Sequence, residues 1–166
     1  MYEEAYSEWL VKCKKPFFVP ILKVLVIVLM PFAILSMLFF WFGFLIVLAL
    51  AAAYFGLNCL GQKEYEYTYV AGELTFDRIL GAQFRKRRMT LSMDDIEQIA
   101  SWDSHELTGL RNRPGIKITD FASGNADAKC YGIVCRKGGE TNLVKFEPGE
   151  RMLQDIKKSA PRKVII

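Results

Sequence analysis

The fold is decided by one apolar stretch, Phe17–Leu60, which reads FFVPILKVLVIVLMPFAILSMLFFWFGFLIVLALAAAYFGLNCL. Its only formally charged residue is Lys23. A bilayer core is crossed by roughly 20 helical residues, so one helix over this stretch would be about twice as long as the core is thick. Two helices joined by a turn, at about 17–38 and 43–60 within a hairpin over 16–61, fit better. The sequence therefore predicts an integral membrane protein that crosses the bilayer twice.

The turn between the two helices is expected within the aromatic run Phe39–Phe44. Gly43 supplies backbone freedom there, and Trp41 is expected to sit at the membrane interface as an aromatic anchor. Pro31 lies inside the first helix, where a membrane helix tolerates a kink.

The basic residues around the apolar stretch predict its orientation. Lys12, Lys14 and Lys15 precede it and Lys63 follows it, whereas the expected turn carries no charge. The positive-inside rule then places both termini in the cytoplasm of a multi-pass cell-membrane protein. Lys23 is near enough to the helix end to extend its ammonium to the headgroups, so we expect it to be a second interface anchor.

A cleavable signal peptide is the alternative to a membrane hairpin. The small residues 49–53 resemble a cleavage site. The apolar stretch is far longer than the 7–15 residues of a signal-peptide core, which favours the hairpin.

Residues 1–15 form an N-terminal amphipathic segment. Its apolar residues recur at helical spacing: Tyr2, Tyr6, Trp9, Leu10 and Cys13. This pattern is compatible with a helix in the membrane interface, anchored by Trp9. It is equally compatible with an ordinary first turn packed on the soluble part of the chain.

After Gly61 the hydrophobic pattern changes from continuous to alternating, which is typical of half-buried strands. Turns are expected at Ala71-Gly72 and Gly81-Ala82, and a hairpin across residues 137–140. Residues 92–102 are predicted to form a helical turn followed by a strand, and 103–115 and 121–127 to form loops. The other expected strands are 64–70, 73–80, 83–91, 115–120, 128–136 and 141–146.

The pattern turns helical near the C-terminus. Met152, Leu153 and Ile156 lie on one side of a helix predicted over about 148–158, and Pro161 ends it. A basic and apolar tail, 161–166, follows. The soluble domain, 62–160, is therefore expected to be mostly β: about seven antiparallel strands in a sandwich or open barrel, capped by a C-terminal helix.

This order of elements resembles a bacterial pleckstrin-homology-like domain preceded by a two-helix membrane hairpin, as in small bacterial membrane proteins of unknown function. The segments that carry the resemblance are Tyr65-Glu66-Tyr67-Thr68, Asp94-Asp95-Ile96 and Phe146-Glu147-Pro148. The resemblance implies a binding module. Basic residues in the early loops of pleckstrin-homology domains hold phosphoinositides, although many bacterial members have no known lipid ligand.

The strongest candidate binding segment is the cationic run Arg85-Lys86-Arg87-Arg88, with Arg111 and Arg113 as additions. Consecutive strand residues point to both faces, so four cations predict an edge strand, a bulge or a loop. Anionic headgroups could bind them at about 1 kcal/mol per cation. The alternative, which we favour, is a solvated strand balanced by Asp94, Asp95 and Glu97.

The sequence shows no constellation for catalysis, cofactor or metal binding. His105, the single histidine, lies in a polar loop, and no phosphate-binding or dinucleotide-binding glycine motif occurs. The cysteines, Cys13, Cys59, Cys130 and Cys135, are expected to be reduced thiols. The formal net charge of +4 is too small to suggest nucleic-acid binding.

The sequence predicts a membrane-tethered, non-enzymatic binding module that recruits a protein partner or senses anionic lipid at the inner face of the membrane. The alternative is an accessory or regulatory subunit of a larger membrane complex. The helical hairpin would then be the interaction surface, through the small residues Gly43, Ala49, Ala51, Ala52, Ala53 and Gly56.

Overall fold

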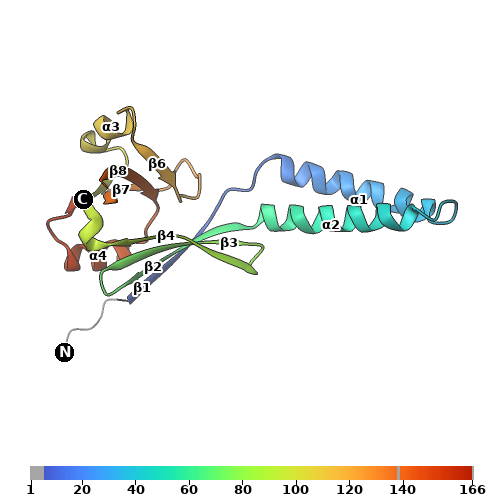
Figure 1. Ribbon diagram of the computed structural model, residues 1–166, viewed down its shortest axis with the longest axis horizontal. Helices are drawn as coiled ribbons and strands as arrows, with labels where there is room; N and C mark the ends of the chain where they lie inside the picture. The colour runs from blue at the N-terminus through green and yellow to red at the C-terminus, as the bar shows by residue number, and fades with distance from the viewer. Residues whose placement is uncertain (1–5, 138, 166) are drawn as a thin grey trace.

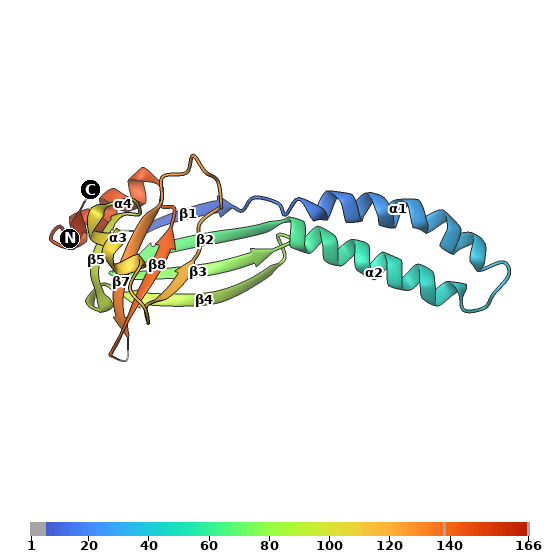
Figure 2. The same cartoon turned by 90° about the horizontal axis from the view of Figure 1, so that it is seen from above.

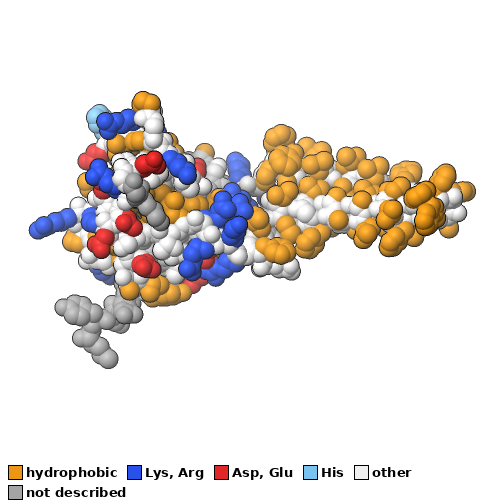
Figure 3. Space-filling view, in the orientation of Figure 1, with side chains coloured by type: hydrophobic (Ala, Val, Ile, Leu, Met, Phe, Trp, Pro, Cys, Tyr) orange, Lys and Arg blue, Asp and Glu red, His pale blue; other side chains and the backbone are white. Residues whose placement is uncertain are grey.

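Two apolar helices project from a domain of two β-sheets in the computed structural model, which describes residues 6–137 and 139–165 (Figure 1). Helices α1 (Phe18–Ser36) and α2 (Gly43–Gly61) lie antiparallel and side by side (Figures 1 and 2). By length and composition both can span a bilayer. Their exposed surface is almost entirely apolar (Figure 3).

The turn between the helices covers 37–42, two residues earlier than expected. Trp41 lies in it with 83% of its surface exposed. A Cβ atom at Gly43 would lie 2.6 Å from the Met37 Cα, so glycine permits the close approach that this turn requires. Pro31 lies inside α1 without dividing it.

The first sheet is antiparallel and has the order β1-β2-β3-β4. Its strands are β1 (Tyr6–Lys12), β2 (Lys63–Val70), β3 (Glu73–Leu80) and β4 (Phe84–Ser92). The helical hairpin is therefore the connection between two paired strands, β1 and β2. The Cys13 N–H donates to the Lys63 carbonyl at 3.0 Å, which fixes the entry of the hairpin beside its exit.

Of the two alternatives for residues 1–15, the interface helix is wrong, because β1 occupies residues 6–12; the segment packs on the soluble domain, but as a strand rather than as a helical turn. Ser7 and Val11 are buried while the residues between them are exposed, and the strand pairs along its whole length with β2. Trp9 packs on Gly149 in the soluble domain rather than in an interface helix. Tyr2 lies outside the described residues. Pairing with β2 satisfies the backbone of this segment, and that outweighs its helix-like spacing.

The second sheet has the order β6-β8-β7-β5-β9. A 3₁₀ turn, η1 (Met93–Asp95), leads into it from β4, as expected. Its strands are β5 (Ile96–Ser101), β6 (Lys117–Asp120), β7 (Tyr131–Lys137), β8 (Glu140–Phe146) and β9 (Val164–Ile165).

The described chain thus has nine strands where about seven were expected, and the two additions are β1 and β9. The expectation of antiparallel strands throughout was also wrong, because β6 pairs parallel to β8 and β9 parallel to β5. In the tail, Val164 is buried; Ile166 lies outside the described residues, as does Gly138 in the β7–β8 turn.

The core lies between the two sheets. Tyr67 and Phe76 from the first sheet and Phe146 from the second are fully buried, with ring centroids 5.4–6.0 Å apart. Helix α4 (Glu150–Ser159) contacts β1 and buries Met152, Leu153 and Ile156 against this core, as predicted.

The segment 103–115 is not only a loop, because it contains α3 (His105–Arg111). The Ser104 side chain caps this helix by accepting from the Leu107 N–H at 3.4 Å. Leu107 is buried on the outer face of the second sheet against Ala100, Val134 and Leu143. The helix is too short to show a periodic pattern, and only its cap could have indicated it.

Candidate functional site

The cationic run 85–88 lies on β4, an edge strand of the first sheet; an edge strand, a bulge or a loop was expected because consecutive cations point to both faces of a strand. A β-bulge interrupts the pairing with β3 at this point: Phe76 pairs with Met89 and Asp77 with Arg87, so Arg88 is the extra residue. The side chains of 85–88 are all exposed.

Two of these four cations are already neutralised within the fold. The Arg85 guanidinium lies 2.6 Å from the Glu66 carboxylate and 2.7 Å from that of Asp77. Arg87 lies 3.6 Å from Asp77. The carboxylates expected to balance the run were Asp94, Asp95 and Glu97. That expectation is wrong, because the partners come from β2 and β3, and Glu97 pairs with Arg136 at 3.3 Å.

The carboxylates that hold Arg85 belong to a polar network on the outer face of the first sheet. Glu66 and Asp77 are only 5% and 4% exposed, although the face is open to solvent. Glu8 shares a hydrogen bond with Glu66 across β1 and β2, and the Tyr6 hydroxyl donates to Glu8 at 2.7 Å. The network therefore crosses all four strands.

Burial shifts the protonation of this network. Desolvation, followed by the hydrogen bond that protonated Glu66 donates to Glu8, raises the pKa of Glu66 to about 7, against the lowering effect of Arg85. The hydrogen bonds from Glu66 and Tyr6 lower the pKa of Glu8. The hydrogen bond to Asp77 raises the pKa of Arg85. One proton is thus held between Glu8 and Glu66 up to about neutral pH.

Lys86 and Arg88 form no ion pair within the described part of the chain. They remain available to an external anion. The cationic run is therefore divided by strand geometry into one pair bound by carboxylates and one pair open to solvent.

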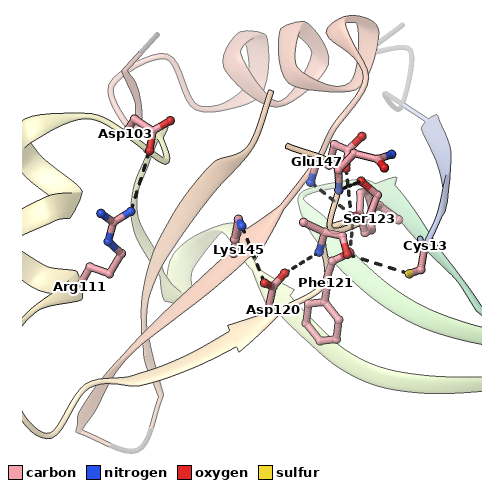
Figure 4. Close-up of polar contacts among 11 residues, drawn as sticks. Cys13, Asp103, Arg111, Asp120, Phe121, Ser123, Lys145 and Glu147 are labelled. Atoms are coloured by element: carbon pink, nitrogen blue, oxygen red, sulfur yellow. Dashed lines mark hydrogen bonds and ion pairs between the residues drawn. The ribbon is translucent and has the colours of Figure 1, made fainter. Parts of the chain in front are cut away.

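Arg111 and Arg113 do not join this patch. Arg111 belongs to α3 on the outer face of the second sheet, where it lies 4.0 Å from Asp103 (Figure 4). Its guanidinium also lies over the Trp102 ring, 5.3 Å from the ring centroid. Arg85 lies on the outer face of the first sheet, on the opposite side of the core. The expectation that Arg111 and Arg113 add to the 85–88 run is thus wrong.

Arg113 instead lines an open cleft of about 540 Å³ on the outer face of the second sheet. Val134 and Ile116 form apolar parts of its wall, and Arg136 and Glu140 form polar parts. Sequence reasoning did not find this cleft, because it is assembled from β5, the segment after α3 and the β7–β8 hairpin.

A second hollow, of about 250 Å³, lies where the helical hairpin joins the sheet. Lys12 lines it from the end of β1, Lys15 from the strand-to-helix connection and Lys63 from the start of β2. Figure 3 shows Lys and Arg side chains gathered at this junction between the domain and the helices. These lysines already supported the predicted orientation of the hairpin, but their spacing in the sequence did not show that they line one hollow.

Backbone hydrogen bonds hold this junction together. The Lys14 N–H donates to the Ser123 carbonyl at 2.8 Å, and the Gly81 N–H to the Gln62 carbonyl at 2.9 Å. Behind them, the Tyr67 hydroxyl donates to the Phe121 carbonyl at 2.7 Å and burial raises its pKa. The Glu147 carboxylate accepts from the Ser123 N–H at 3.1 Å (Figure 4). The loop after β6 thereby fastens the connection into α1 to the core.

The three expected interface anchors have different surroundings. Trp41 is exposed at the tip of the hairpin. The Lys23 ammonium donates to the Asn58 side chain at 2.6 Å and lies near the Gly61 end of α2. Trp9, on β1, packs on Gly149 at the N-cap of α4.

The remaining reactive groups do not converge. His105 is exposed at the first position of α3. No group of three or more metal-ligating side chains occurs within the described ranges. Burial raises the pKa of the Cys13 and Cys130 thiols, which makes both poorer nucleophiles.

Comparison with known protein families identifies a match over nearly the whole chain. The family model described as "Bacterial PH-like domain (DUF6106)" matches residues 3–166. No curated protein matches, and no solved structure matches.

Proposed function

The chain belongs to the bacterial PH-like domain family (DUF6106), and from that premise we propose that it is a membrane-tethered, non-enzymatic binding module. Its two apolar helices cross the membrane as a hairpin, both termini are cytoplasmic, and the domain meets its ligand at the inner face of the membrane. The ligand class that we favour is anionic lipid.

The observation that carries this proposal is the place of the hairpin in the fold. The apolar helices connect two adjacent, paired strands, and three backbone hydrogen bonds fasten their base to the domain: those from Cys13, Lys14 and Gly81. A domain joined in this way is held at high effective concentration beside the bilayer. Weak contacts with headgroups then suffice for binding.

The position of the cations supports the same proposal. Each helix has 19 residues, a length of about 28 Å that matches the bilayer core. Lysines gather at the end of the hairpin that joins the domain, whereas no charged residue lies in the turn 37–42. This asymmetry favours a cytoplasmic domain.

Cysteine labelling in intact cells tests the topology. Two variants are made in a background in which the four native cysteines are replaced by Ala: Trp41→Cys at the hairpin tip and Lys157→Cys on α4. We expect an impermeant maleimide added outside to label only the tip variant, and the α4 variant only after permeabilisation. Labelling of the α4 variant from outside, or recovery of the protein in the soluble fraction, would contradict the proposal.

A second candidate function is that of a subunit of a larger membrane complex, and the exposure of the small residues of α2 favours it. Ala49, Ala52 and Ala53 are exposed, and a Cβ atom at Gly56 would meet nothing within 4 Å. These positions are therefore open to a further helix, and small residues allow close helix packing in a membrane. Cross-linking in native membranes tests it: recovery of the chain only as a monomer rejects this function.

A further inference from the structure

We propose that the hollow at the base of the helical hairpin, lined by Lys12, Lys15 and Lys63, is a binding site for the phosphate group of an anionic phospholipid. The site rests on the proposed membrane-tethered function and gives it a ligand position. It is distinct from the cationic run 85–88.

The first support is the level at which the hollow lies. Lys15 is three residues before α1 begins, and Gly61, which also lines the hollow, is the last residue of α2. Because both helices are as long as the bilayer core is thick, their domain-side ends coincide with the headgroup region. The hollow therefore opens where lipid phosphates lie.

The second support is unneutralised charge. Lys12, Lys15 and Lys63 form no ion pair within the described residues, whereas Arg85 contacts two carboxylates. Among the described residues that line the hollow, Glu64 supplies the single carboxylate against three lysines, so positive charge remains in excess. The excess draws an anion to a site at the membrane surface, where each lysine contributes attraction.

The third support is that the walls are fixed in the fold. Strand pairing holds Lys12 opposite Glu64, and the Cys13 N–H to Lys63 carbonyl bond closes the gap between the two connections. The Lys63 ammonium lies over the Tyr65 ring, 4.6 Å from its centroid. A site whose backbone is already ordered loses little entropy when the anion binds.

The neighbouring contact between α1 and α2 points the same way. The Lys23 ammonium lies beside Asn58 and 3.8 Å from the position of a Gly61 Cβ atom. It thus places a further positive charge at the last turn of α2, where it offsets the negative end of the helix dipole that an anion would otherwise meet.

Native mass spectrometry of the detergent-solubilised full chain tests this site. The probes are phosphatidylglycerol, zwitterionic phosphatidylcholine and inorganic phosphate. The test variant is the triple Lys12→Ala, Lys15→Ala, Lys63→Ala. The matched control is the triple Arg151→Ala, Lys157→Ala, Arg162→Ala, which removes the same charge from exposed positions in and beyond α4, away from the helices (Figure 2).

We expect phosphatidylglycerol to be retained by the wild type and by the control, and phosphatidylcholine to be retained far less. The test variant should bind phosphatidylglycerol on the order of a hundredfold more weakly, because three lysines are lost. A triple Lys→Arg variant, which keeps the charge, should retain the lipid; this outcome excludes misfolding as the cause.

Three results would overturn the proposal. These are equal retention by the test and control variants, equal retention of the two lipids, and binding of inorganic phosphate with no retention of phosphatidylglycerol. If the hollow does not bind lipid but the proposed topology is correct, the cysteine-labelling pattern stays as expected. If the proposed topology is wrong, that pattern changes, so the two outcomes are distinguishable.

Discussion

The cationic strand β4 and the base of the helical hairpin look equally basic in the sequence, but the fold treats them differently. On β4, Arg85 and Arg87 contact the buried carboxylates of Glu66 and Asp77. The base of the hairpin differs, because a hollow there is lined by Lys12, Lys15 and Lys63. These lysines form no ion pair within the described residues. Cross-strand partners, rather than the number of cations in a run, therefore decide which positive charges remain available for a ligand.

The largest expected effect concerns Glu66, which lies 2.6 Å from the Arg85 guanidinium and shares a proton with Glu8. The pKa of Glu66 is raised in the fold, so its contribution to stability is present at low pH and is lost as the pH rises through about 7. The pKa of Glu8 is lowered, so its contribution is lost only as the pH falls below its ordinary range. We expect the stability of the sheet to fall between pH 5 and pH 8, by roughly 3 kcal/mol at most.

Glu66→Gln should remove this pH dependence. The measurement is hydrogen exchange of the β1 and β2 amides of the detergent-solubilised full chain at several pH values, corrected for intrinsic exchange rates. Glu73→Gln on β3 is the matched control and should keep the wild-type slope. A slope that persists in Glu66→Gln would show that another group is responsible.

The next effect concerns the charge balance of β4. Asp77→Asn removes the acceptor that lies 2.7 Å from Arg85 and 3.6 Å from Arg87. Because charge-assisted hydrogen bonds contribute about 1.5–3 kcal/mol, we expect a loss of about 2 kcal/mol in stability. Arg87 then loses its ion-pair partner and Arg85 keeps only Glu66, so β4 should come closer to the hairpin base and retain more phosphatidylglycerol.

Asp94→Asn, on the exposed 3₁₀ turn, is the control and should leave stability unchanged within about 0.5 kcal/mol. Thermal unfolding followed by circular dichroism measures both variants. Equal effects of the two substitutions would mean that the ion pairs of Asp77 carry no stabilisation.

Lys23 is a test of the difference between paired and unpaired cations, because it lies near the base of the hairpin and yet donates a hydrogen bond to Asn58. Asn58→Leu leaves its ammonium without the side-chain acceptor at 2.6 Å, and we expect a loss of about 1 kcal/mol in helix pairing. The double variant with Lys23→Leu should recover most of it, because two apolar side chains then meet in an apolar hairpin. Steric trapping of unfolding in bilayers measures the cycle, and additive losses would argue against a direct contact.

The smallest effect is expected from the two solvent-exposed members of the β4 run. Lys86→Ala and Arg88→Ala remove no ion pair within the described residues, so each should change stability by less than about 0.5 kcal/mol. Arg85→Ala should cost clearly more. If all three substitutions have the same effect in chemical denaturation, the division of the run into paired and unpaired cations is incorrect.

The sequence was sufficient to predict helices and strands whose hydrophobic pattern lies within a single continuous segment. The apolar stretch indicated α1 and α2 because composition alone decides a helix of that kind. Alternation indicated β2 and β3, and the 3.6-residue spacing of Met152 and Ile156 indicated α4. The resemblance to a PH-like domain is confirmed by the family match over residues 3–166.

The sequence was insufficient where a residue's role depends on a distant partner. Trp9 looks like an interface anchor until β1 pairs with β2 and brings it against Gly149. Arg85 looks available until two strands place Glu66 and Asp77 beside it. The hollow was missed for the same reason, because Lys15 and Lys63 are separated by the whole hairpin and come together only when its ends are joined.

Solid-state NMR of the full chain in phosphatidylglycerol-containing bilayers tests the difference between the two cationic regions most directly. The measurement is the dephasing of side-chain nitrogen signals by lipid phosphorus, which reports contact within a few ångströms. We expect dephased lysine Nζ signals that disappear in the triple variant Lys12→Ala, Lys15→Ala, Lys63→Ala, with the Arg85 and Arg87 guanidinium signals unaffected. If the two arginine signals are dephased and the lysine signals are unchanged by the triple substitution, the assignment of lipid binding to the hairpin base is contradicted.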